Sequence, residues 1–323
     1  MSSPIEVSVV IVTYNSEWIE LRRTIGSFIK QKRISIQIII ADDGSKDNHK
    51  SSIIDFFENN CFENYELVFN EHNHGTVSNI ISGLKKAVGQ YVKIISPGDY
   101  AYDDSVLSNI YRFACEKGYE FVFGDAVYYS NNSGKIEILT DVSSPMRKDI
   151  YKRYSVKKAF KRLSVYGDNI SGAISFIQRD LAIEILQEIC PYVKYCEDLS
   201  FALIPLKQKK MGYYPSSIIW YQYGTGISTN KKMTINKYLL EDMISFWKFV
   251  YDNYKRNLFV WRVYYFTKLR VKNNSLGNRV AKLLVCPERV FYWYSLRNYY
   301  YKPQFEIKKL DIVFNEEDIK VAK

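Results

Sequence analysis

The sequence has few of the features that mark secreted or membrane-spanning proteins. Its five cysteines are an odd, scattered set without a Cys-x-x-Cys pair, which argues against both a disulfide framework and a zinc site. The N-terminal stretch lacks the basic region and cleavage site of a signal peptide. No apolar run approaches the roughly 18 residues that a spanning helix needs. We therefore expect a reduced, cytoplasmic compartment.

Glycine and proline are also scarce, with 15 and 8 residues in a chain of 323. Hydrophobic residues make up 47% and charged residues 25%, a globular composition with enough apolar side chains for a large core. The length exceeds that of an average domain, and it allows one large α/β domain with an appendage.

Positive charge is concentrated near the C-terminus. Residues 243–302 contain twelve lysines and arginines but only two acids, Asp252 and Glu288. Their surplus of ten positive charges equals the net charge of the whole chain, +10, so the rest of the sequence is electrically balanced.

The first part of the chain alternates between apolar runs and amphipathic stretches. The β-branched runs 7–12 and 36–40 predict buried strands of a parallel sheet. Apolar residues between 18 and 28 recur at helical spacing. The alternation continues with strands near 65–69, 91–95 and 120–125 and with helices near 51–58 and 77–88. This order predicts a doubly wound α/β half. Residues 126–230 are irregular apart from a helix near 180–189, an amphipathic run after Glu197-Asp198 and a strand-like stretch at 218–221.

Polar loops follow three of the predicted strands, at Tyr14-Asn15, at Asp42-Asp43 and at 96–99. Ligands of such sheets collect outside the carboxyl ends of the strands, so these loops could share one crevice. Asp99 ends a buried strand after a Pro-Gly turn. A carboxylate drawn out of water needs a cationic partner or a metal, which makes Asp99 a candidate ligand.

Taken together and in order, these motifs resemble those of the family 2 glycosyltransferases with the GT-A fold. The resemblance covers about residues 6–226. It is carried by Thr13-Tyr14-Asn15, Asp42-Asp43-Gly44-Ser45, Asn73-His74-Gly75-Thr76, Ala87-Val88-Gly89-Gln90-Tyr91, Ser96-Pro97-Gly98-Asp99 and Glu197-Asp198. It implies an α/β fold of the GT-A type, Rossmann-like with a mostly parallel central sheet, followed by a mainly helical C-terminal extension.

The same resemblance implies a division of the chain. Residues 1–230 would form the catalytic domain, with a nucleotide-sugar half over about 1–125 and an acceptor half over 126–230. Residues 231–323 would form a basic, aromatic-rich helical region.

The implied activity is inverting transfer of a sugar from a nucleotide-diphosphate donor, with UDP favoured, assisted by Mg²⁺ or Mn²⁺. Asp99 is the implied metal ligand, since one carboxylate suffices when phosphates supply the other oxygens. Most relatives carry further acids in this motif, and here two are missing. An acid that merely caps the Pro-Gly turn is the alternative.

The resemblance implies that the loops after the strands bind the nucleotide-sugar donor. Asp42 and Asp43 would bind the nucleoside, although Asp-Gly and Gly-Ser also form ordinary turns. Asn73, Gly75 and Thr76 precede a helix whose N–H groups favour an anion, and helix capping is the other role open to them. The remaining expected donor contacts are Thr13, Tyr14, Asn15, Ser96 and Gly98.

Asp198 is the expected general base, which takes the proton of the acceptor hydroxyl. Glu197 could hold that role instead. Both acids could also serve only the dipole of the helix that follows them.

The C-terminal region interleaves aromatic residues with lysine and arginine. Such a segment could hold an enzyme peripherally at the inner face of the cell membrane, where a glycan or lipid-linked acceptor would lie. Packing on the catalytic domain or in a homo-oligomer is the alternative. No nucleic-acid recognition module is evident.

A catalytically inactive GT-A-fold binding or scaffold protein at the membrane surface is the competing function, because the 96–99 motif has lost acids. A dehydrogenase is disfavoured, since no Gly-x-Gly-x-x-Gly follows the first strand.

Overall fold

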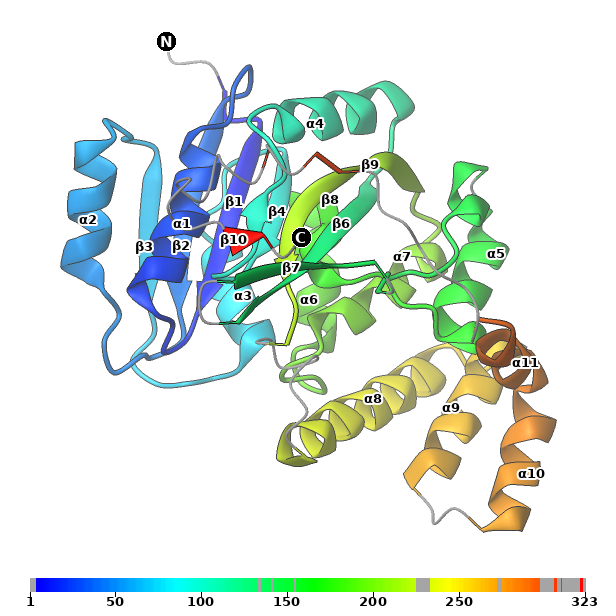
Figure 1. The fold of residues 1–323 in the computed structure, drawn as a ribbon. Coiled ribbons are helices and arrows are strands. Elements are labelled where there is room, and N and C mark those ends of the chain that lie inside the picture. Colours follow the sequence, from blue (N-terminus) through cyan, green and yellow to red (C-terminus); the bar gives the residue numbers. More distant parts are fainter. Residues whose placement is uncertain are drawn as a thin grey trace.

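The computed structural model describes residues 4–132, 135–140, 142–153, 155–224, 233–271 and 275–296, with short pieces at 305–306, 309 and 320–321. Within these ranges the strands form one ten-stranded sheet in the order β10-β7-β6-β8-β4-β1-β2-β3, with β9 paired to β6 and β5 to β9. Figure 1 shows helices on both faces of this sheet and a separate group of helices at its lower right. The mixed α/β architecture confirms the predicted fold class.

Parallel pairing builds the N-terminal half of the sheet. Strand β1 (Val7–Thr13) lies between β2 (Ile36–Asp42) and β4 (Tyr91–Ile95), and β3 (Tyr65–Phe69) pairs with the far side of β2. All residues of β2 and β4 are buried, which explains why their sequences are continuously apolar rather than alternating. Parallel pairing brings the carboxyl ends of these strands to the same edge.

Helices cover both faces of this half. They are α1 (Trp18–Ile29), α2 (Lys50–Asn59), α3 (Thr76–Leu84) and α4 (Val106–Lys117). Helix α3 lies close to the sheet because Gly83 has no side chain, and an added Cβ would sit 2.7 Å from Val10 and 3.1 Å from Ala41.

The second half of the sheet corrects the reading of residues 126–230 as irregular. Strand β6 (Phe121–Asn132) continues past Asp125, which therefore lies inside a strand rather than at its end. Strands β5, β7, β8 and β9 complete the sheet, at Tyr100–Ala101, Lys135–Leu139, Ser175–Gln178 and Met211–Gln222. Local periodicity misses β5, β7 and β8, which are only two to five residues long, whereas the strand-like stretch 218–221 lies within β9.

Short helices connect these strands. They are η1 (Asp149–Lys152), α5 (Val156–Lys161), the π-helical η2 (Arg162–Tyr166), η3 (Gly172–Ile174), α6 (Arg179–Ile189), η4 (Glu197–Ala202) and α7 (Leu203–Leu206).

In the described part of the chain, four helices follow the sheet domain: α8 (Met233–Asn253), α9 (Leu258–Val271), α10 (Leu276–Val285) and α11 (Pro287–Ser295). Many of their aromatic side chains are buried, including Phe246, Trp247 and Phe266, so part of the aromatic content serves packing. The short β10 (Lys320–Val321) pairs with β7. None of the described helices has both the length and the apolar character needed to cross a membrane.

Gly89 should be intolerant of a side chain, because it lies against the backbone of β1. A Cβ there would sit 2.7 Å from the carbonyl carbon of Val7. We expect Gly89→Ala to lower the free energy of unfolding by about 1–3 kcal/mol, the usual cost of overpacking. The matched control is Gly277→Ala in α10, where nothing lies within 4 Å of the new methyl group. Urea unfolding should show destabilisation for Gly89→Ala and none for the control, and equal midpoints would contradict this packing.

Candidate active site

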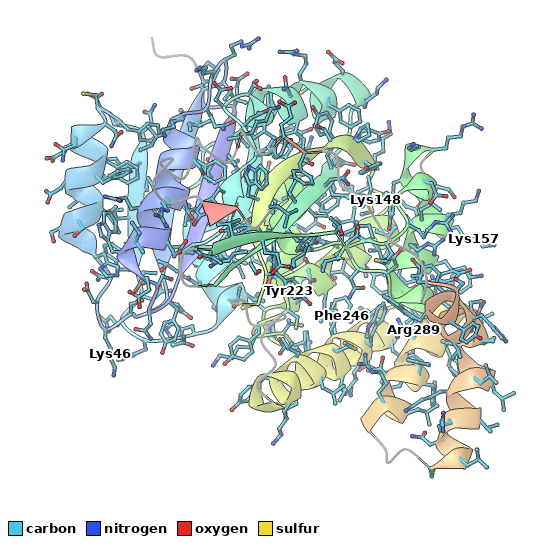
Figure 2. All side chains as sticks on the ribbon, viewed as in Figure 1. Lys46, Lys148, Lys157, Tyr223, Phe246 and Arg289 are labelled. Atoms are coloured by element: carbon cyan, nitrogen blue, oxygen red, sulfur yellow. The ribbon has the colours of Figure 1, made fainter. Side chains whose placement is uncertain are left out.

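A cavity of ≈190 Å³ opens at the carboxyl ends of β1 and β4. It brings together two acidic motifs that lie about a hundred residues apart, since Asp99, Glu197 and Asp198 all line it. Thr76 and Ser96 line the same cavity. Figure 2 labels two residues that follow strands of the sheet: Lys46, after β2, at the lower left of the sheet domain, and Tyr223, after β9, near the middle of the molecule.

The turn that carries Asp99 is fixed on all sides. Gly98 adopts a φ of +92°, and an added Cβ would meet the side chain of Gln222. Its carbonyl accepts a hydrogen bond of 2.6 Å from the Tyr129 hydroxyl, and its N–H donates to Thr24 at 3.2 Å. The Asp99 carboxylate accepts a hydrogen bond of 2.9 Å from the backbone N–H of Gln222. This turn is therefore clamped between α1, β6 and β9.

Lys93 is a cation that the sequence motifs do not include. It lies within β4, is only 2% exposed, and donates to the backbone carbonyls of Ile94, Ala173 and Ser175. Burial lowers its pKa to about 7, and burial raises the pKa of Asp99 to about 7, while the attraction between the two opposes both shifts. Asp99 is thus coupled electrostatically to a buried lysine, and it also lines the cavity.

The second acidic motif begins η4. Burial raises the pKa of Glu197, and the negative charge of Asp198 raises it further. Burial also raises the pKa of Asp198, while the backbone N–H groups of Leu199 and of Asp198 itself oppose that shift. Of the two acids, Asp198 is therefore the one that ionises more readily.

The loop in front of these acids is held by Asp242 of α8, which sequence analysis did not single out. Its carboxylate accepts hydrogen bonds from three consecutive backbone N–H groups, those of Lys194 at 3.0 Å, Tyr195 at 2.6 Å and Cys196 at 3.0 Å. Asp242 is 6% exposed. The position of Glu197 and Asp198 thus depends on a C-terminal helix.

Asp42 and Asp43 both accept hydrogen bonds from their own protein. Asp42 accepts from the backbone N–H and the hydroxyl of Ser45. Asp43 accepts from the backbone N–H groups of His74 at 2.9 Å and Gly75 at 2.8 Å. Both acids are nearly inaccessible, at 1% and 3% exposure. These contacts support a structural role beside the expected nucleoside contact.

The loop after β1 is joined to the loop after β2. Asn15, at a φ of +47°, donates its backbone N–H to the Ser45 hydroxyl, and its side-chain oxygen accepts from the N–H of Lys46. Thr13 is buried, and its hydroxyl donates to Ser16. Tyr14 is half exposed. Of the expected donor residues here, only Tyr14 presents a large, accessible ring.

The Asn73–Thr76 loop connects the two halves of the site. Gly75 adopts a φ of +94°, and an added Cβ would lie 2.9 Å from the carbonyl oxygen of Lys194. The N–H of Val77, two residues further on, donates to that same carbonyl at 3.1 Å. Asn73 is exposed. The expected site residues that do not line the cavity are Thr13, Tyr14, Asn15, Asp42, Asp43, Asn73, Gly75 and Gly98.

The cavity offers few protein atoms that could bind a metal ion. No cluster of three or more histidines, cysteines or acids suited to a metal occurs among the described residues. The Asp99 carboxylate lines the cavity with one oxygen bonded to Gln222. One carboxylate fits a hard cation whose other ligands are phosphate oxygens and waters, but it does not fit a cation held by protein alone.

Comparison with known proteins identifies the family. The model of glycosyl transferase family 2 matches residues 8–185, more than half of the chain. An uncharacterized glycosyltransferase of Mycoplasma genitalium is 28% identical over 172 residues, 49% of this chain and 55% of the relative. The Escherichia coli UDP-Glc:alpha-D-GlcNAc-diphosphoundecaprenol beta-1,3-glucosyltransferase WfgD is 24% identical over 127 residues, 39% and 48% of the two chains. Each match thus spans about half of the relative's length.

Among solved structures, S. aureus TarS 1-349 in complex with UDP-GlcNAc has a TM-score of 0.58 with this chain. The superposition covers 88% of this chain and 81% of TarS 1-349 at 14% sequence identity. At that identity the likeness shows the fold, which is of the GT-A type. With the match to the family model, it leads to one conclusion: the chain belongs to the family 2 glycosyltransferases.

Proposed function

We propose that this protein is an inverting glycosyltransferase that moves a sugar from a nucleotide diphosphate, preferably UDP, to a hydroxyl of a glycan or lipid-linked acceptor. The observation that carries the proposal is that Asp99, Glu197 and Asp198 line one cavity beyond the carboxyl ends of the parallel strands. That is where open α/β sheets bind nucleotides.

In this proposal Asp198 is the general base. The acceptor oxygen attacks the anomeric carbon, the bond from that carbon to the diphosphate breaks, and the acceptor proton passes to the Asp198 carboxylate. Glu197 is the alternative base. Since the pKa of Glu197 is raised to about 8, it is largely protonated at neutral pH, so it suits donation of a hydrogen bond better than acceptance of a proton.

Asp99 would hold Mg²⁺ or Mn²⁺ together with the donor diphosphate. A divalent cation would neutralise the negative charge that develops on the leaving diphosphate. Lys93 orients the wall of this subsite, because its ammonium group fixes the carbonyls of residues 173 and 175. Asp42 and Asp43 hold the loops that would bind the nucleoside. Tyr14 and Asn73 are the exposed residues of these loops.

The proposal extends to the class of substrate and to the place in the cell where the protein acts. The name of WfgD describes a UDP-linked donor and a diphosphoundecaprenol acceptor, and TarS has been crystallised with UDP-GlcNAc. An acceptor of that kind, used in making a bacterial surface polysaccharide, would lie at the inner face of the cell membrane. Exposed aromatic residues of the C-terminal helices could contact that surface, namely Trp261, Tyr265, Phe291, Trp293 and Tyr294.

The competing function is an inactive scaffold that has kept the fold. The observation that favours it is the lone acid of the 96–99 turn, together with the internal hydrogen bonds of Asp42 and Asp43.

Release of UDP from UDP-sugars should separate the two functions. We expect Mn²⁺-dependent turnover by the wild type, abolished by EDTA. Asp198→Asn should retain donor binding in a thermal-shift assay and lose about 10²–10⁴-fold in turnover. Asp252→Asn, an exposed acid that pairs with Lys248, is the matched control and should behave as wild type. Donor binding without turnover by the wild type, across UDP-sugars and acceptors, would favour the scaffold.

The pH profile should report the base. Burial raises the pKa of Asp198 to about 6, above the about 4 of an ordinary aspartate. With Mn²⁺ and donor saturating, so that the metal keeps Asp99 ionised, kcat/KM for the acceptor should fall tenfold per unit as pH drops below about 6, because the base must be ionised, and it should be independent of this group above that value. Glu197→Gln should leave this limb in place. A limb near pH 4 would refute Asp198 as the buried base.

Asp242→Asn should impair turnover from outside the cavity. An amide has one acceptor oxygen in place of two, so three backbone N–H groups lose part of their partner. We expect kcat to fall about tenfold or more as Asp198 is displaced, with little change in the KM for the donor. Asp252→Asn on the same helix is the control. Equal losses in kcat for both variants would indicate a general effect of charge removal.

A further inference from the structure

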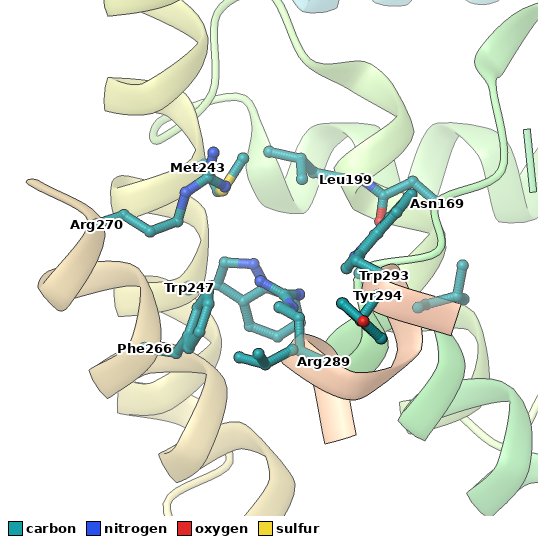
Figure 3. Close-up of a pocket in the computed structure, with 12 residues that line it drawn as sticks. Asn169, Leu199, Met243, Trp247, Phe266, Arg270, Arg289, Trp293 and Tyr294 are labelled. Carbon is teal, nitrogen blue, oxygen red and sulfur yellow. The ribbon is translucent and has the colours of Figure 1, made fainter. Parts of the chain in front are cut away.

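A second cavity, of ≈560 Å³, lies between the C-terminal helices and the sheet domain. Figure 3 shows Arg270 and Met243 on one side of it and Arg289 with Trp247 toward its centre, while Trp293 and Tyr294 close the other side. This cavity contains none of the residues assigned to the active site above.

The two cavities share their walls. Residues one to four positions apart in sequence line one cavity each. These pairs are Asn169 and Ser171, Leu199 and Asp198, and Met243 and Leu239, the first of each pair in the larger cavity. A ligand in the larger cavity would thus lie on the other side of the segment that carries Asp198.

Arg289 is fixed in this cavity by backbone carbonyls, and no acid among the described residues pairs with it. Its guanidinium donates from Nε to the carbonyl of Val165 at 2.9 Å and from Nη2 to that of Ser164 at 2.6 Å. It also lies 4.7 Å above the ring of Phe266. Among the described residues, Nη1 of Arg289 has no hydrogen-bond partner. This side of the guanidinium group could therefore donate to a ligand.

Arg270 is the second charge. Its hydrogen bond in the described part of the chain is from Nη1 to the sulfur of Met243, at 3.1 Å. Burial lowers the pKa of Arg289 to about 10, and the positive charge of Arg270 contributes a smaller part of that shift. Arg262, in contrast, pairs with Glu288 on the same group of helices. The two arginines repel each other and lie beside tryptophans, and no carboxylate of the described residues pairs with either of them. An anion bound between them would be attracted by both charges.

We propose that this cavity binds the phosphate or diphosphate group of the acceptor, with Arg270 and Arg289 as its ligands, and that the acceptor sugar passes around the edge of the 198–199 segment so that its hydroxyl reaches Asp198. The inference rests on the proposed function. Arginine suits this role because its planar fork matches phosphate oxygens in pairs, and tryptophan surfaces accommodate the sugar or alkyl groups on either side.

Direct binding can test the site without knowledge of the acceptor. Calorimetric titration with inorganic pyrophosphate would be performed with the donor site saturated by UDP. We expect saturable binding to the wild type and about tenfold weaker binding to Arg270→Gln, as expected for loss of a charge-assisted hydrogen bond. Arg279→Gln removes an exposed arginine of α10 that does not line the cavity and should bind as wild type. Absence of binding, or equal weakening in both variants, would overturn the proposal.

Kinetics and vesicles separate the possible sources of phosphate. With a diphosphate-linked acceptor, Arg270→Gln should raise the acceptor KM about tenfold and leave the donor KM and donor hydrolysis unchanged. Sedimentation with phosphatidylglycerol vesicles should be the same for Arg270→Gln and Arg279→Gln. A vesicle defect confined to Arg270→Gln would assign the arginines to a lipid headgroup instead. If the wild type does not bind the donor, the proposed function is wrong. Pyrophosphate binding that depends on Arg270 is measured in a different experiment, so failure of the two proposals can be distinguished.

Discussion

The hydrogen bond from the Gln222 N–H to the Asp99 carboxylate is the constraint on which the site depends. It joins the end of β4 to the end of β9, strands from the two halves of the sheet. Gly98 makes the approach possible, since its backbone has a positive φ and any side chain would meet Gln222. The buried ammonium of Lys93 offsets part of the cost of burying this acid. An isolated carboxylate could not remain there as an anion without such compensation.

Acids outside the cavity perform a different task from the acids within it. Asp43 and Asp242 are both buried, and each accepts hydrogen bonds from consecutive backbone N–H groups of a loop distant in sequence. The two loops meet where Val77 donates to the carbonyl of Lys194. Glu197 and Asp198 are held by this framework, yet burial raises their own pKa values. Loop position and reactivity therefore come from separate carboxylates.

The sequence predicts the parallel half of the fold well, because β1, β2 and β4 are buried on both faces and read as continuous apolar runs. It fails for β7 and β8, which are five and four residues long, and it gives only the 218–221 part of β9, whose register with β6 is interrupted near Asp125. The meeting of Asp99 with Asp198 was anticipated through family resemblance, since no local pattern relates residues so far apart. Lys93 was missed although a lysine inside an apolar strand is a readable signal, and Asp242 was missed because one acid in a helix is ordinary.

The C-terminal helices are more than an appendage to the sheet. Helix α8 supplies Asp242 to the loop before the acidic pair, Leu239 to the smaller cavity and Met243 to the larger one. A domain boundary near residue 230 would therefore separate groups that build one site. The aromatic residues divide accordingly: those facing the sheet domain, such as Trp247, pack in the core, and those facing outward, such as Phe291, stay accessible. Their basic neighbours raise the local positive potential, which would draw an anionic acceptor toward the cavity before any contact forms.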